Sequence, residues 1–132
     1  GKAAIRREGG DVTVLAIAGM TRHAIAAADE LAGEGVSVEV IDPRSLVPFD
    51  KETLLDSVRK TGRLVVVDPA NRTCGAAAEI SAIVAEEGFW DLRAPIMRVT
   101  TPDIHVPYSP PLEAELYPDK RKIAEAIRQT LA

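Results

Sequence analysis

Apolar residues in this sequence occur in short, nearly continuous runs separated by amphipathic segments. Four such runs are expected to form buried strands, at residues 12–18, 36–41, 64–67 and 95–99. Short runs without regular polar alternation are typical of strands that are covered on both faces of a parallel sheet. A shorter leading strand is expected over residues 3–7, before the turn at Gly9, Gly10 and Asp11.

Helical periodicity follows four of these strands. The first helix is expected over residues 22–33 with Thr21 as its N-cap. The others begin at Asp50, Gly75 and Asp119, and Gly62 is expected to end the second. The residues expected to face the core are Ala24, Ala27, Ala28, Leu31, Leu54, Leu55, Val58, Ile80, Ile83, Val84, Ile123, Ile127 and Leu131.

Strands that alternate with single helices predict an α/β fold, a three-layer α/β/α sandwich with a mostly parallel sheet. The length of 132 residues favours a single domain over residues 1–132. Such a chain is long enough to bury a core without disulfides or metals.

Residues 100–118 break this pattern. The segment holds five of the nine prolines and both tyrosines, and we expect an irregular loop. Long loops in compact domains are commonly functional, and tyrosine and proline offer rigid contact area at low entropic cost. The residues expected to contact a partner are Pro107, Tyr108, Pro110, Leu112 and Tyr117. Packing of the loop onto its own domain is the alternative.

Charge and composition exclude several classes of function. The formal net charge is −4, which argues against nucleic-acid binding. No apolar run approaches the length of a membrane span, and no secretory leader is expected.

The first residue, Gly1, is not Met, which fits an excised domain or a processed or tagged chain. The single cysteine, Cys74, excludes an internal disulfide and a multi-thiolate zinc site, and favours the cytoplasm or an organelle matrix.

A doubly wound sheet forms a crevice at the carboxyl ends of its strands. The turn at Gly19, Met20 and Thr21 would lie there, and its backbone amides could bind an anion. The turn has one glycine and no phosphate-binding motif, so plain helix capping is the alternative.

Few residues are candidates for catalysis. His23 and His105 are the two histidines, and neither is expected to have a nucleophile beside it. Cys74 precedes a helix that could lower its pKa, but a small buried residue is the preferred interpretation. No metal-ligand spacing is present. We therefore assign no catalytic, cofactor-binding or metal-binding residue.

Several segments, taken in order, resemble one family. They are Gly9-Gly10-Asp11-Val12-Thr13-Val14, Asp42-Pro43-Arg44-Ser45-Leu46-Val47-Pro48-Phe49-Asp50, Ser57 to Arg63, Ala78-Glu79-Ile80, and Val106-Pro107-Tyr108-Ser109-Pro110-Pro111-Leu112-Glu113. Over its whole length the chain resembles the C-terminal domain of the β subunit of thiamine-diphosphate-dependent 2-oxoacid dehydrogenases, which include the pyruvate, branched-chain 2-oxoacid and acetoin enzymes. The loop from Asp68 to Gly75 departs from the family's usual His-Glu and Gly-Gly residues and leans toward the acetoin type.

The resemblance implies a five-stranded sheet in the order first, third, second, fourth, fifth, with the leading strand antiparallel at one edge. It implies that thiamine diphosphate and Mg²⁺ bind between the α subunit and the N-terminal domain of β, so that residues 1–132 bind no cofactor and are not catalytic alone. The implied partners are a second β subunit, the α subunit and the lipoyl acyltransferase core, the last docking near the final helix and the carboxylate of Ala132.

Two alternatives remain open. One is the C-terminal domain of another thiamine-dependent enzyme, a transketolase or a deoxyxylulose-phosphate synthase. The other is a free-standing regulatory module that binds anions at Gly19–Thr21. The expected location is the cytoplasm, or the mitochondrial matrix in a eukaryote.

Overall fold

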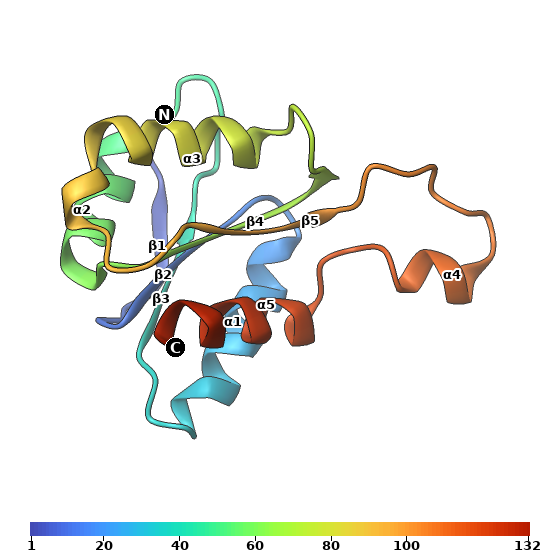
Figure 1. Cartoon of the computed structure of the whole chain (residues 1–132), viewed down its shortest axis with the longest axis horizontal. Coiled ribbons are helices and arrows are strands. Elements are labelled where there is room, and N and C mark those ends of the chain that lie inside the picture. The colour runs from blue at the N-terminus through green and yellow to red at the C-terminus, as the bar shows by residue number, and fades with distance from the viewer.

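A five-stranded sheet in the order β1-β3-β2-β4-β5 forms the centre of the computed structural model, which describes residues 1–132 (Figure 1). The strands are β1 (Ala4–Arg7), β2 (Val12–Ala16), β3 (Val38–Asp42), β4 (Leu64–Asn71) and β5 (Met97–Thr101). β1 pairs antiparallel with β3, and every other pair is parallel. The α/β fold, the strand order and the antiparallel edge strand are therefore confirmed.

Helices cover both faces of the sheet, which confirms the three layers. They are α1 (Met20–Ala32), α2 (Lys51–Thr61), α3 (Ala76–Glu87), the 3₁₀ turn η1 (Phe89–Asp91), α4 (Pro110–Ala114) and α5 (Lys120–Leu131). Figure 1 shows α1 and α5 on one side of the sheet and α2 and α3 on the other. None of these helices has the length and apolarity needed to cross a membrane.

Two apolar layers result from this arrangement, one on each face of the sheet. The layer under α1 and α5 contains Val12, Val14, Ala16, Val38, Val40, Val65, Val67 and Val99. The layer under α2 and α3 contains Leu15, Ile41, Leu64 and Val66. Successive side chains of a strand point to opposite faces, so each apolar run supplies both layers. This explains why the runs lack polar alternation.

The predicted helix faces and caps are mostly confirmed. Asp50 and Asp119 accept hydrogen bonds from the amides of Thr53 (3.2 Å) and Lys122 (2.8 Å), and Gly62 ends α2 with a left-handed φ of 73°. All the predicted core residues are buried except Leu55, Ile83 and Leu131, which are partly buried.

Several sequence-based boundaries were wrong. Thr21 is not an N-cap, because α1 begins at Met20 and the Thr21 hydroxyl instead donates to the carbonyl of Ala16 (3.1 Å). β2 ends at Ala16, before the left-handed Ala18 (φ 54°). β5 runs two residues further than expected, because Thr100 and Thr101 pair with an extended β4.

The two loop predictions need correction as well. Residues 68–71 continue β4, so the polar loop is limited to 72–75. The segment 100–118 is not wholly irregular, since prolines at the first turn nucleate the short helix α4. Cys74 is exposed rather than buried, because it lies in the turn outside the sheet.

Candidate interface at the carboxyl edge of the sheet

The carboxyl ends of the parallel strands meet at one edge of the sheet, where α/β folds usually place their sites. Three non-glycine residues with left-handed backbones lie just beyond these ends: Ala18 after β2 (φ 54°), Arg44 after β3 (φ 60°) and Cys74 after β4 (φ 59°). Each such residue costs on the order of 1 kcal/mol, and such strain concentrates at functional sites. The loops at this edge are therefore the first candidates for a functional site.

The loop after β3 is held by hydrogen bonds rather than by apolar packing. Asp42 accepts from the guanidinium of Arg6 (2.8 Å) and from the amide of Arg44 (3.0 Å), and the Ser45 hydroxyl donates to the carbonyl of Pro48 (2.7 Å). Burial acts to raise the pKa of Asp42, but the hydrogen bonds from Arg6 and Arg44 outweigh it and lower the pKa. The loop has a fixed shape.

The loop after β4 is closed by Asp68. Its carboxylate accepts from the amides of Ala70 (2.9 Å) and Ala77 (3.2 Å), and the second bond caps the start of α3. Gly75 is required here, since a Cβ would lie 2.5 Å from the carbonyl oxygen of Asn71. The exposed thiol of Cys74 belongs to no group of side chains that could hold a metal ion.

Residues 102–118, which we call the arm, leave the body of the domain after β5 and return at α5. Figure 1 shows the arm standing clear of the body beyond the end of β5. Asp103 accepts from both the amide (3.0 Å) and the hydroxyl of Thr73, and the Asn71 side chain donates to the carbonyl of Pro102 (2.8 Å). The hydrogen bonds from Thr73 lower the pKa of Asp103. These contacts fix the outgoing end of the arm.

The returning end of the arm is fixed by Lys122 of α5. Its ammonium donates to the carbonyls of Glu115 and Tyr117 (3.0 Å), and Pro118 is buried. Four large apolar side chains between the two fixed ends are exposed. They are Ile104, Val106, Tyr108 and Leu112, and Tyr108 is fully exposed.

The structure brings most of the predicted interface residues together on the arm. Tyr108, Pro110 and Leu112 are exposed there, while Pro107 and Tyr117 are partly buried. Ala132 is exposed but lies elsewhere: Figure 1 shows the C-terminus at the end of α5 away from the arm. The predicted interface residues therefore form two separate surfaces.

The structure offers few free donors at the predicted anion site, Gly19–Thr21. The amides of Met20 and Thr21 donate to the carbonyls of Ile17 and Ala18, both at 3.2 Å, so two of the expected donors are already paired. Gly19 supplies no side-chain cap. Anion binding at this turn stays a prediction.

The histidines are not joined to a nucleophile. His23 is partly buried in α1, and His105 is exposed at the base of the arm, where it lines a shallow hollow with Asn71, Thr73, Asp103 and Ile104. No three His, Cys, Asp or Glu side chains converge in a way that could hold a metal ion.

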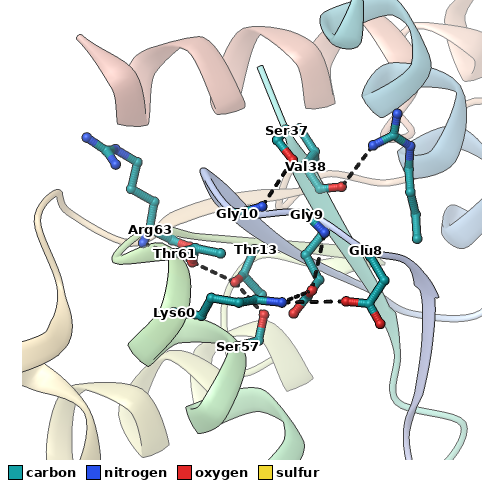
Figure 2. A network of polar contacts seen from close by, with 12 residues as sticks. Glu8, Gly9, Gly10, Thr13, Ser37, Val38, Ser57, Lys60, Thr61 and Arg63 are labelled. Carbon is teal, nitrogen blue, oxygen red and sulfur yellow. Dashed lines mark hydrogen bonds and ion pairs between the residues drawn. The ribbon is translucent and has the colours of Figure 1, made fainter. Parts of the chain in front are cut away.

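A polar cluster that the sequence analysis missed lies at the opposite, amino edge of the sheet (Figure 2). The carboxylate of Glu39 in β3 is 1% exposed, and it binds the ammonium of Lys60 in α2 and the amide of Gly9 (3.3 Å). Lys60 also approaches Glu8 at 3.6 Å. The single acidic residue inside the predicted strand 36–41, Glu39, was the available signal in the sequence.

Three hydroxyl groups extend this cluster beneath α2. Thr13 Oγ1 lies 2.6 Å from Ser57 Oγ and 2.8 Å from Thr61 Oγ1, and the Thr61 hydroxyl donates to the carbonyl of Arg63 (3.1 Å). No buried side-chain nitrogen or oxygen lacks a partner. The cluster therefore joins the turn after β1 to β2, β3 and α2 without leaving a buried side-chain polar atom free for a ligand.

The spacing of Ser57 and Lys60 in the sequence matches that of a serine–lysine catalytic pair. Such a pair needs a neutral lysine as its base, and Lys60 is not neutral. The hydrogen bond to Glu39 raises the pKa of Lys60, so this amine stays protonated and cannot act as a base. Burial acts to raise the pKa of Glu39, but the hydrogen bonds from Lys60, Ser57 and Gly9 outweigh it and lower the pKa. The pair is charged, and its role is structural.

A second apolar surface surrounds η1. Phe89 and Trp90 stack edge to face with ring centroids 5.0 Å apart, and Trp90 is 92% exposed. The hollow beside them is lined mainly by apolar residues, including Leu92, Pro95 and Ile96.

Comparisons of the sequence with known proteins match nearly the whole chain to one kind of domain. Residues 1–123 match a family described as the C-terminal domain of transketolase. The β subunit of acetoin:2,6-dichlorophenolindophenol oxidoreductase from Bacillus subtilis is 44% identical over 131 residues, which are 99% of this chain and 38% of that protein. The β subunit of the pyruvate dehydrogenase E1 component from Staphylococcus epidermidis is 42% identical and covers 99% of this chain and 40% of that protein.

Further relatives extend the range. The mitochondrial β-1 subunit of the pyruvate dehydrogenase E1 component from Arabidopsis thaliana is 44% identical, covering 98% of this chain and 36% of that protein. The chain thus spans between 36% and 40% of the length of these relatives. Among solved structures, a split-gene transketolase in an inactive β4 tetramer has a TM-score of 0.87 and 30% identity, covering 98% of this chain and 42% of that one. A 2-oxoglutarate:ferredoxin oxidoreductase from Magnetococcus marinus, at 13% identity and a TM-score of 0.64, shares the fold alone.

Proposed function

Because this chain belongs to the family of transketolase C-terminal domains, we propose that it is the assembly domain at the C-terminal end of the β subunit of a thiamine-diphosphate-dependent 2-oxoacid or acetoin dehydrogenase. The identities of 42–44% to acetoin and pyruvate dehydrogenase β subunits support this assignment. The proposal places the enzyme in the cytoplasm, or in the mitochondrial matrix in a eukaryote, as the name of the Arabidopsis relative suggests.

The side chains of this domain do not fit magnesium-bound thiamine diphosphate. No trio of acidic, His or Cys side chains is placed to hold the metal, and the amides of Met20 and Thr21, the first residues of α1, are already paired. In the proposed enzyme the cofactor is held by the α subunit and the preceding domain of β.

The arm is the observation that carries the proposal. It presents four large apolar side chains to solvent, while Asp103 and Lys122 fix its two ends. A fixed apolar projection loses little conformational entropy on binding, which favours association. We propose that the arm packs against a neighbouring subunit of the same enzyme, with a second β subunit as the partner.

Assembly can be tested in the intact enzyme with α and β subunits coexpressed. The variant Tyr108→Asp combined with Leu112→Asp should shift the sedimentation coefficient toward smaller species at micromolar concentration. Both side chains are exposed in the domain, so its own melting temperature should not change. Trp90→Asp is the matched control, because it charges an equally exposed aromatic position outside the arm. An arm variant that keeps the wild-type mass across a dilution series contradicts the proposal.

The end of α5 is proposed as a separate contact, with the lipoyl acyltransferase core. A terminal carboxylate at Ala132 would pair with a basic residue of that partner when Ala132 ends the subunit. Adding two glycines after Ala132 displaces the carboxylate and should weaken binding of the acyltransferase at least tenfold in calorimetry, without altering the subunit mass. Unchanged affinity would remove Ala132 from the interface.

Transketolase is the second candidate, and the similarity to the split-gene transketolase structure favours it. The two candidates differ in their reactions. The intact protein with its partner subunit should decarboxylate a 2-oxoacid, or cleave acetoin, in the presence of an electron acceptor. Transfer of a two-carbon unit between sugar phosphates, without an electron acceptor, would instead support the transketolase assignment.

A further inference from the structure

The loop Arg44–Pro48, which we call the β3 loop, leaves two apolar side chains exposed to solvent. Val47 is 92% exposed and Leu46 is 44% exposed. Isolated exposed apolar residues are common, but this loop is rigidly built. Asp42 and Ser45 hold its backbone by hydrogen bonds, and Arg44 keeps a left-handed φ of 60°.

The first residues of the chain lie against the same loop. A Cβ built on Gly1 would lie 3.3 Å from Cγ of Pro48, so the backbone of Gly1 is in contact with the loop. The amide of Ala3 donates to the carboxylate of Asp50 (3.0 Å). The hydrogen bonds from Ala3 and Thr53 lower the pKa of Asp50 to about 2, so the carboxylate is charged and the contact persists at neutral pH. Any polypeptide that precedes Gly1 therefore emerges beside Pro48, the neighbour of Val47 in the chain.

The size of the relatives indicates what emerges there. This chain matches a C-terminal domain and spans 38–40% of the length of relatives at 42–44% identity. In such relatives most of the remaining length precedes the C-terminal domain, and the proposed function places the same polypeptide before Gly1. That polypeptide is tethered next to the β3 loop, which gives it a high effective concentration at this surface compared with any separate partner.

We infer that Leu46 and Val47 are the docking point for the domain that precedes Gly1 in the same polypeptide. This inference rests on the proposed function, because it requires a longer β subunit. Asp50 fixes the point of entry, and the β3 loop inserts Val47 into an apolar recess of the preceding domain. The interface sets the orientation of this domain, and hence of the arm, relative to the rest of the subunit.

Thiol labelling in the intact β subunit tests this inference directly. The variants Val47→Cys and Trp90→Cys are made in a background that lacks other reactive cysteines, with Cys74→Ser included. Both positions are 92% exposed in this domain, so they provide a matched pair. The Val47→Cys thiol should react with a maleimide at least tenfold more slowly than the Trp90→Cys thiol.

The remaining outcomes separate this inference from the proposed assembly. Labelling is repeated on the β subunit alone at increasing dilution. Slow reaction at Val47→Cys that persists in the single polypeptide supports the inference, even if the arm variants leave the subunit mass unchanged. Equal rates at the two positions overturn it. Protection that disappears when the subunits separate also overturns it, because the occupant is then another chain.

A second variant, Val47→Asp, tests the same docking without introducing a cysteine. Val47→Asp should lower the temperature at which this domain unfolds in the intact subunit and speed protease cleavage just before Gly1. The same substitution should leave the sedimentation coefficient unchanged. Wild-type cleavage and unfolding in the Val47→Asp subunit would contradict the docking.

Discussion

The ammonium of Lys60 in α2 binds the carboxylate of Glu39 in β3, where Glu39 is 1% exposed. This pair ties a helix of one outer layer to the central sheet. A buried carboxylate that loses its counter-charge remains desolvated, so the loss of one partner destabilises more than the pair itself stabilises. The pair is therefore expected to be sensitive to single substitutions.

Lys60→Met should lower the free energy of unfolding by about 1–3 kcal/mol, since it leaves Glu39 buried without its cation. The Lys60 side chain is itself 45% exposed, and water access keeps the loss in this range. Urea unfolding at pH 7 measures it. Lys51→Met is the control, because the Lys51–Glu87 pair is solvent-exposed and should contribute at most about 1 kcal/mol. Equal losses in the two variants would show that burial of Glu39 has no energetic role.

The same pair predicts the pH dependence of stability. Folding lowers the pKa of Glu39 below 4.5, so its contribution is present above that pH and is lost as the pH falls below it. Folding raises the pKa of Lys60 above 10.5, so its contribution is lost as the pH rises beyond that value. Glu39→Gln should flatten both limbs of a stability profile measured by urea unfolding. An unchanged acid limb would exclude a role for Glu39.

Asp50 predicts a second, more acidic transition. Its pKa falls from 3.8 to about 2 on folding, which corresponds to roughly 2 kcal/mol of stability at neutral pH. This contribution is present above the unfolded value of 3.8 and is lost as the pH drops through about 2. Asp50→Asn should lower stability at pH 7 by roughly that amount and remove the transition between pH 4 and 2, as followed by circular dichroism. Asp56→Asn changes a neighbouring exposed carboxylate and should do neither.

Two adjacent glycines provide a sharp test of packing at the turn after β1. A Cβ at Gly9 would lie 2.2 Å from the carbonyl carbon of Val38, which is backbone and cannot move aside, whereas a Cβ at Gly10 would meet nothing within 4 Å. Gly9→Ala should destabilise the domain by about 3 kcal/mol or more, and Gly10→Ala by less than about 1 kcal/mol. Thermal unfolding compares them. Similar melting temperatures would mean that the turn can detach from β3 without penalty.

The outgoing end of the arm can be loosened without disturbing the core. Thr73→Val removes the hydroxyl that donates to Asp103, and the contact is exposed, so the melting temperature should change little. Cleavage within residues 103–109 by a dilute protease should become several-fold faster. Thr100→Val alters a threonine of β5 away from Asp103 and serves as the control. Cleavage at the wild-type rate in Thr73→Val would show that the arm is fixed by other contacts.

The sequence predicted the layers well because their physical cause is local. Val14, Leu15 and Val66 belong to runs whose successive residues face two covered sides of a sheet, and this leaves a clear pattern. The order of the strands came from the resemblance to a family, since pairing depends on contacts between distant segments. The caps Asp50 and Asp119 were predictable, because an N-cap acts within three residues of itself.

The details of the loops could not be read in the same way. Ala18, Arg44 and Cys74 adopt left-handed backbones, and no glycine or asparagine marks these positions in the sequence. No local feature of the sequence marks Lys60, because its link to Glu39 forms only when α2 lies across β3. The composition of the arm left open whether Tyr108 is exposed or packs onto its own domain, and the placement of Ala132 away from the arm likewise required the fold.

The arm is inserted between β5 and α5, and α5 returns to the core through Ile123 and Ile127, which are fully buried. Neither of the two apolar layers contains a residue of the arm, and Pro118 is buried only where the arm meets α5. Insertions, deletions and substitutions in the arm are therefore expected to leave the folding of the rest of the domain unchanged. Related domains would therefore differ in their binding partners while they keep the same fold. In protein design, the arm could be replaced by another segment of similar end-to-end distance.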